Sequence, residues 1–173
     1  AQIEEVSLFS VTNMIQTNSS FTDNGVAKVF PSGTTADFTF PVGQAYYTPV
    51  IFDFADIGPG SGSGSTPATI TIRPANERHP IIIEDVESGL CLSQIDDINN
   101  VLQYHWIVTA ENTNNFESNV SMQYDQSLVA LANGELESSY LAARIRTSDN
   151  TVFKFPGAVN SGTNTVSFQF NDV

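Results

Sequence analysis

Hydrophobic and polar residues alternate with a period of two along most of this chain. In the first half, Phe38 and Phe40 alternate with polar neighbours, and segments 50–54 and 68–72 repeat the pattern. The alternation continues through the second half, in segments 104–108, 120–124, 141–145, 153–155 and 166–170. Because successive side chains of a strand point to opposite faces of a sheet, each segment predicts a strand with one buried face.

Turn-forming residue pairs separate these segments, as at Asn24-Gly25, Asn133-Gly134 and Ser161-Gly162. About nine or ten short strands at such spacing predict an all-β fold, an antiparallel β-sandwich of the immunoglobulin-like or jelly-roll-like kind. Helical spacing of apolar residues occurs only in segment 93–102, so we expect at most one short helix.

The segment 58–66 is rich in glycine and serine and has the composition of a flexible connection. We interpret it as the loop of a long hairpin that joins strands 50–54 and 68–72, with a boundary between two subdomains as the alternative. The predicted organisation is one β-sandwich module over residues 25–173. Residues 1–24 form either an N-terminal edge strand or the end of an upstream stalk.

The charge of the chain limits its partners. Nineteen acidic residues against six basic ones give a formal net charge of −13, which disfavours binding to nucleic acid. No stretch reaches the roughly 18 apolar residues of a membrane span, so no membrane insertion is expected. The single cysteine, Cys91, excludes an internal disulfide, and its apolar neighbours predict a buried, inert thiol.

Residues that support catalysis are sparse in the sequence. Of the two histidines, His79 falls in a predicted loop, and His105 is predicted to face solvent from its strand, opposite Tyr104 and Trp106. No serine lies in a recognisable nucleophile motif. We therefore predict that the chain is not an enzyme. A glycoside hydrolase stays the alternative enzyme class because of its acidic pairs, which are Glu84/Asp85 with Glu87, Asp96/Asp97, Glu135/Glu137 and Asp53/Asp56.

The sequence also contains two candidate binding sites. No cofactor is expected, but carboxylates at Asp53, Asp56, Glu84 and Asp85 are a candidate calcium site if the loops meet at one end of a sandwich. The aromatic pair Tyr46 and Tyr47 precedes Thr48-Pro49 in a turn-like stretch, which makes the pair a candidate carbohydrate platform. Trp106 alternates with buried residues and is predicted to pack in the core.

Two short segments resemble a known group of modules. Phe38-Thr39-Phe40-Pro41-Val42-Gly43 followed by Tyr46-Tyr47-Thr48-Pro49-Val50 resembles the "FPVG…Y-x-P-V" stretch of very large surface and secreted proteins of Bacteroidetes, which export adhesins by the type IX route. The segments 102–108, 120–124 and 140–144 resemble the "R-Y-W-x-V … L-x-Y … L-x-V-A-R" arrangement of the same modules. Together the similar segments extend over about residues 25 to 170.

This resemblance implies an extracellular or cell-surface β-sandwich that serves cell adhesion or surface architecture, and it implies no catalytic residues. We expect either a module of a longer protein or a stand-alone relative. The predicted function is that of a non-catalytic structural or adhesive module, one that assembles into a fibre, array or homo-oligomer through strand edges such as 164–171. Its partners would be proteins or glycans at a surface. A carbohydrate-binding module is the alternative.

Overall fold

The computed structural model describes residues 8–17, 23–31, 34–59, 67–80, 100–131 and 134–171. Within these ranges the chain forms twelve strands, of which three have only two residues, and two 3₁₀ turns, with no α-helix. The prediction of an all-β sandwich is confirmed. The segment predicted as a short helix, 93–102, lies outside the described residues except for 100–102, where no helix forms.

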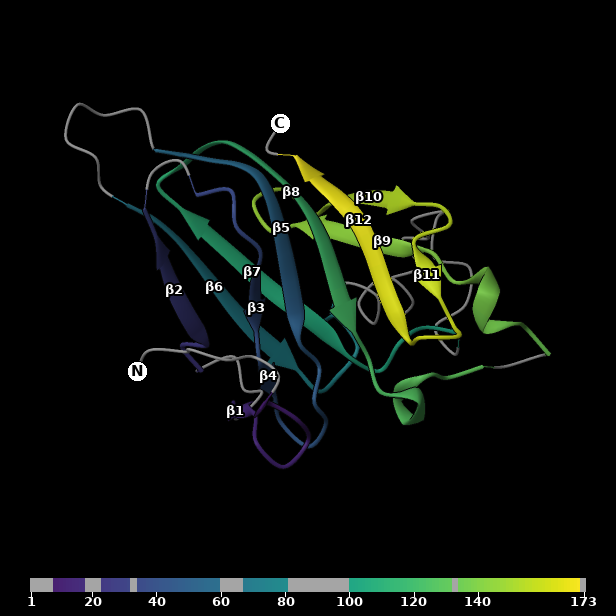
Figure 1. Ribbon diagram of the computed structural model, residues 1–173. Coiled ribbons are helices and arrows are strands. Elements are labelled where there is room, and N and C mark those ends of the chain that lie inside the picture. Colours follow the sequence, from purple (N-terminus) through teal and green to yellow (C-terminus); the bar gives the residue numbers. More distant parts are fainter. Residues whose placement is uncertain are drawn as a thin grey trace.

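The larger sheet has five strands in the order β11-β12-β8-β5-β3. Figure 1 shows it in front, with β12 and β5 on either side of β8. All neighbours are antiparallel, and the register places Phe52 opposite Val120 and Val120 opposite Phe168. Along the chain the bounds are β3 (Phe38–Phe40), β5 (Val50–Pro59), β8 (Thr113–Gln123), β11 (Val159–Asn160) and β12 (Thr165–Asn171).

The smaller sheet has three antiparallel strands in the order β2-β6-β7. Its strands are β2 (Val26–Phe30), β6 (Ala68–Ala75) and β7 (His105–Glu111). In β6, the side chains of Ala68, Ile70 and Ile72 are buried while the intervening residues are partly exposed, which is the predicted alternation. This sheet therefore turns one apolar face to the larger sheet, as two packed layers require.

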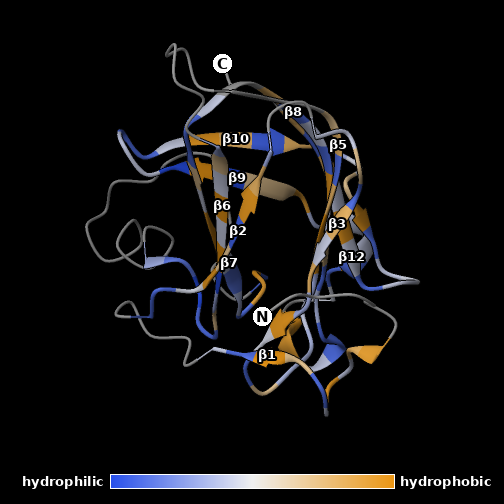
Figure 2. Ribbon diagram, turned by 60° about the vertical axis from the view of Figure 1, so that its left-hand side comes forward, coloured by the Kyte–Doolittle hydropathy of each residue, from blue (hydrophilic) through white to orange (hydrophobic). Residues whose placement is uncertain are grey.

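Two further strand pairs occur in the described part of the chain. A hairpin of β9 (Ala142–Arg146) and β10 (Thr151–Phe155) lies between the two sheets at one side of the sandwich, as seen in Figure 2. Its Phe155 ring stacks on Phe168 of β12 at a centroid distance of 4.8 Å. A short parallel pair joins β1 (Ile15–Gln16) to β4 (Val42–Gly43), so part of the 1–24 segment does pair as a strand.

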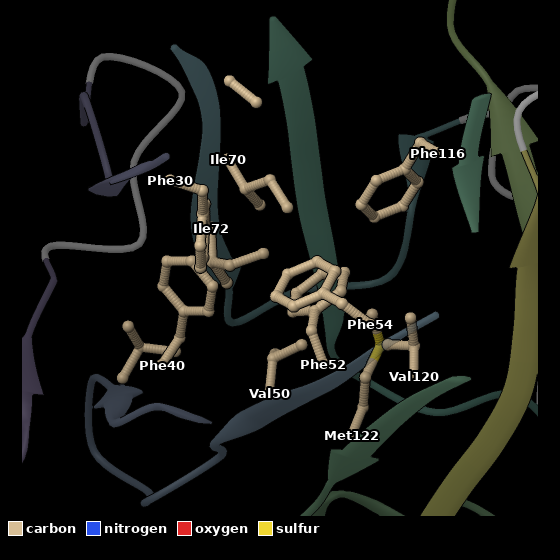
Figure 3. Close-up of a cluster of buried hydrophobic side chains, with 12 residues drawn as sticks. Phe30, Phe40, Val50, Phe52, Phe54, Ile70, Ile72, Phe116, Val120 and Met122 are labelled. Carbon is tan, nitrogen blue, oxygen red and sulfur yellow. The ribbon is translucent and has the colours of Figure 1, made fainter. Parts of the chain in front are cut away.

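Phenylalanine is the most frequent residue in the core between the sheets, with five of the twelve residues of the buried cluster (Figure 3). Phe52 is fully buried, and its ring lies 5.7 Å from that of Phe40 and 6.1 Å from that of Phe116. Phe30 of the smaller sheet meets Phe54 of the larger sheet edge to face, with centroids 4.9 Å apart. Such edge-to-face contacts are favourable beyond the area that they bury, so the rings fix how the two sheets face each other.

The structure corrects two expectations about strands. The segments before and after the glycine- and serine-rich run do not form a hairpin, because β5 pairs with β3 and β8 whereas β6 pairs with β2 and β7. The chain thus changes sheets here. In segment 141–145, alternation predicts that Leu141, Ala143 and Ile145 share the buried face, and this is also wrong: Ala142 is buried, while Leu141, just before β9, is 50% exposed. Most of the glycine- and serine-rich run itself lies outside the described residues.

Within the described residues, no helix has the length and apolar character needed to cross a bilayer.

Candidate binding sites

The predicted aromatic platform lies in the connection between β4 and β5. Tyr47 forms an isolated antiparallel bridge with Gly43, and the rings of Tyr46 and Tyr47 are both half-buried. Burial raises the pKa of the Tyr47 phenol. Neither tyrosine is fully open to solvent, and the connection that carries them is held in a tight turn by the hydrogen bond from the Gln44 amide to the carbonyl oxygen of Tyr46.

Next to this turn, the polar tips of three side chains meet where the two sheets come together. The hydroxyl groups of Thr48 and Tyr104 are 2.6 Å apart, and both residues are buried. The indole nitrogen of Trp106 donates to the carbonyl oxygen of Thr48 at 3.2 Å. Trp106 is half-buried and packs against the core, edge to face with Tyr104 at 5.2 Å. Core packing of Trp106 is therefore the arrangement observed.

A hollow lies on the outer face of the larger sheet, over β5, β8 and β12, and both polar and apolar residues line it. The register aligns Asp53, Asn119 and Gln169 in one row across the three strands. The Asn119 amide donates to the Asp53 carboxylate at 3.4 Å, and the Gln169 amide donates to Glu117 at 2.8 Å. The hollow measures about 430 Å³, and its lining includes Ile51, Asp53, Asn119, Ser121, Ser167 and Gln169.

The residues of the predicted calcium site are only partly described. Asp53 lies within β5 on an exposed face, rather than in a loop at one end of the sandwich. Asp56 follows on the same strand, past a register shift against β8, and the structure describes its backbone only. Glu84 and Asp85 lie outside the described residues. Among the side chains that are described, no three histidine, cysteine, aspartate or glutamate residues form a cluster suited to a metal.

In the acidic pair Glu135/Glu137, the second residue has a structural role. Glu137 accepts hydrogen bonds from the Tyr124 hydroxyl and, at 2.8 Å, from the Gln126 amide. Burial, followed by the hydrogen bond and charge of Glu137, raises the pKa of Tyr124. These bonds connect the segment after β8 to the turn before β9, so Glu137 holds local structure in place.

Of the two histidines, His79 lies in an irregular segment after β6, as predicted, whereas His105 differs from its prediction. His105 was expected to face solvent, but its ring is half-buried and lies edge-on to His79 at a centroid distance of 5.0 Å. The Nδ1 atom of His105 is 2.8 Å from the carbonyl oxygen of Glu77. The reason is the β6–β7 pairing, which places His105 opposite Ala75 and so beside the chain that leaves β6 toward His79. Strand alternation within one segment cannot reveal such a neighbour.

The polar row on β5, β8 and β12 was also not identified from the sequence beyond Asp53. Alternation alone would have placed Asn119 and Gln169 on the solvent face of their strands. Their alignment with Asp53 depends on which strands are neighbours and on register, which alternation does not encode.

No family model, no curated protein and no solved structure matches this chain.

Proposed function

We propose that this chain is a non-catalytic structural or adhesive module of an extracellular or cell-surface bacterial protein, and that copies associate through the outer edge of β12. The similarity of its FPVG and Y-T-P-V segments to modules of large Bacteroidetes surface proteins supports the location. The observation that supports association through β12 is that the outer edge of this strand pairs only with the two-residue strand β11.

The backbone N–H and C=O groups of successive β12 residues point alternately toward β8 and toward the opposite, outer side of the strand. The carbonyl of Asn164 accepts from Tyr124, next to the β8 side, whereas the amide of Ser167 donates to Ala158 on the β11 side. By the same alternation, the amides of Gln169 and Asn171 point away from β8. Because β11 has only two residues, Val159–Asn160, no neighbouring strand in the described chain faces these amides.

Among the described residues, the open part of β12 also carries no charged side chain of its own. Charged residues discourage edge-to-edge pairing. The other exposed strand edges of five or more residues carry ionisable side chains: Lys28 in β2, Glu111 in β7, Arg144 and Arg146 in β9 and Lys154 in β10. The open part of β12, residues 168–171, is Phe-Gln-Phe-Asn and has no charge. An extended segment of a second copy would find unprotected donors and acceptors there.

A proline at position 169 tests this proposal. Proline removes the outward amide, and an edge position whose amide faces solvent tolerates it. Q169A is the matched control, because it also loses the bond to Glu117 but retains the amide. We expect the native chain to form dimers or fibres as its concentration rises, seen by light scattering and electron microscopy. Q169P should stay monomeric, and Q169A should assemble like the native chain.

Two results would contradict assembly through β12: a native chain that remains monomeric up to about 1 mM, a concentration at which even weak interfaces are populated, or assembly of folded Q169P equal to that of Q169A. Surface labelling of intact source cells tests the location separately. A label confined to lysed cells would refute an extracellular role.

The hollow over β5, β8 and β12 favours a second candidate function, carbohydrate binding. Asp53, Asn119 and Gln169 present a carboxylate and two amides in one row, and such groups hydrogen-bond sugar hydroxyls well. On this proposal Tyr46 and Tyr47, which do not line the hollow, are not the platform. A glycan array probed with the native chain and with N119A distinguishes the candidates, since binding that depends on Asn119 supports a glycan site and an empty array excludes it.

A further inference from the structure

The chain has two histidines in all, and the fold brings them together. His105 opens β7, and His79 lies in the segment that follows β6. Their rings meet edge to face, with an interplanar angle of 68° and centroids 5.0 Å apart. Both rings are half-buried, so they are partly shielded from water.

The hydrogen bond of His105 determines which of its nitrogens carries the proton. A carbonyl oxygen can only accept, so the contact with Glu77 requires a proton on Nδ1 of His105. The neutral ring then has its lone pair on Nε2. That atom is buried, and no described group forms a hydrogen bond with it. A buried acceptor without a partner is unfavourable unless something else occupies the position.

This arrangement is the one that metal-binding histidines commonly adopt. A ligating imidazole usually donates its second ring N–H to a backbone carbonyl or carboxylate, which orients the other nitrogen toward the metal. Two imidazole nitrogens each about 2.1 Å from a tetrahedral ion put the ring centres about 5 Å apart. The observed centroid distance of 5.0 Å agrees with that value.

We propose that His79 and His105 form a site for a divalent transition-metal ion of the zinc class, bound through Nε2 of His105 and a ring nitrogen of His79, with water in the remaining positions. Imidazole favours zinc, copper and nickel over calcium or magnesium, which prefer oxygen ligands. Glu77 and Arg73 lie near His105, and their charges affect it in opposite directions. The overall charge of −13 attracts cations.

The test is a zinc titration of the chelator-treated full chain. Calorimetry measures binding, and NMR monitors the two imidazole side chains. Excess calcium is present throughout, so that surface carboxylates are occupied by an ion that they prefer. The variants are H79Q and H105Q, with C91S as the control for the single thiol. Melting temperatures without zinc show whether each variant is folded.

We expect the native chain and C91S to bind one zinc ion, with both imidazoles shifting in NMR. Each folded histidine variant should bind at least ten times more weakly. The proposal is overturned if the native chain binds no zinc up to 1 mM, about the weakest affinity of a specific site, or if H79Q binds as tightly as the native chain. It is likewise overturned if binding is lost in C91S while the imidazole signals of the native chain do not move. If H105Q does not fold, H79Q decides the result.

Discussion

The hydroxyl groups of Thr48 and Tyr104, 2.6 Å apart, join the two sheets of the sandwich in its interior. Thr48 lies just before β5 of the larger sheet, and Tyr104 lies just before β7 of the smaller one. Both are buried, with exposures of 0% and 3%. Because a buried polar group without a partner is destabilising, each hydroxyl depends on the other.

A double-mutant cycle measures this dependence. We expect Y104F to lower the free energy of unfolding by about 1 kcal/mol and T48V by about 1–2 kcal/mol, since each leaves one buried hydroxyl with fewer partners. The double variant should lose less than the sum, because neither hydroxyl is then left behind. Urea unfolding followed by fluorescence of the single tryptophan, Trp106, gives the values. Strict additivity would show that the two hydroxyls do not interact.

The same pair predicts how stability depends on alkaline pH. Burial raises the pKa of Tyr104 to about 12, and the hydrogen bond with Thr48 opposes part of that shift. Since the unfolded tyrosine ionises near pH 10, the unfolded state loses its proton first as the pH rises. The stabilisation from this residue is complete below about pH 10 and is lost between about pH 10 and pH 12.

We expect the native chain to lose about 2 kcal/mol more stability over this range than Y104F, which cannot ionise at position 104. Burial also raises the pKa of Tyr47, Tyr124 and Tyr140, so the difference between the two chains is the quantity to measure. Urea midpoints measured for both chains at about pH 8, 10 and 12 give this difference. Parallel curves for both chains would contradict the assignment to Tyr104.

Neighbouring residues on opposite faces of β5 should respond very differently to truncation. Phe52 is fully buried, and its ring stacks on that of Phe54 at 5.5 Å, whereas Ile51 is 40% exposed on the outer face. F52A leaves a cavity in the core and should cost about 4 kcal/mol. I51A should cost about 1 kcal/mol or less. Equal losses in urea unfolding would mean that β5 does not present these two faces.

Two glycines provide a further matched comparison. At Gly43 a methyl group would overlap the carbonyl oxygen of Tyr46 and the sulfur of Met14, so G43A must displace the turn that carries Tyr46. Gly134 has a φ of +76° and no atom within 4 Å of its Cβ position, so G134A brings only backbone strain, worth about 1 kcal/mol. We expect the melting temperature to fall much further for G43A. A larger fall for G134A would contradict the close packing at Gly43.

The sequence alone was sufficient for the fold class and for most strands. Phe38, Phe52 and Ile70 belong to stripes of alternating residues, and alternation is a local property that follows from the geometry of an extended chain. The same stripes identified the buried face of β5, β6 and β8 correctly. Local alternation was less reliable at β9, because Leu141 precedes the strand and its contacts depend on neighbouring elements.

Only the tertiary structure decided which strands are neighbours. The chain crosses from one sheet to the other between β5 and β6, although their sequences also suit a hairpin. Pairing of β6 with β7 brings His79 to His105, and the order β12-β8-β5 aligns Gln169, Asn119 and Asp53. The physical reason is that strand order and register depend on contacts between distant segments, whereas alternation depends only on each segment itself. The sequence therefore determined the kind of fold, and long-range pairing determined its sites.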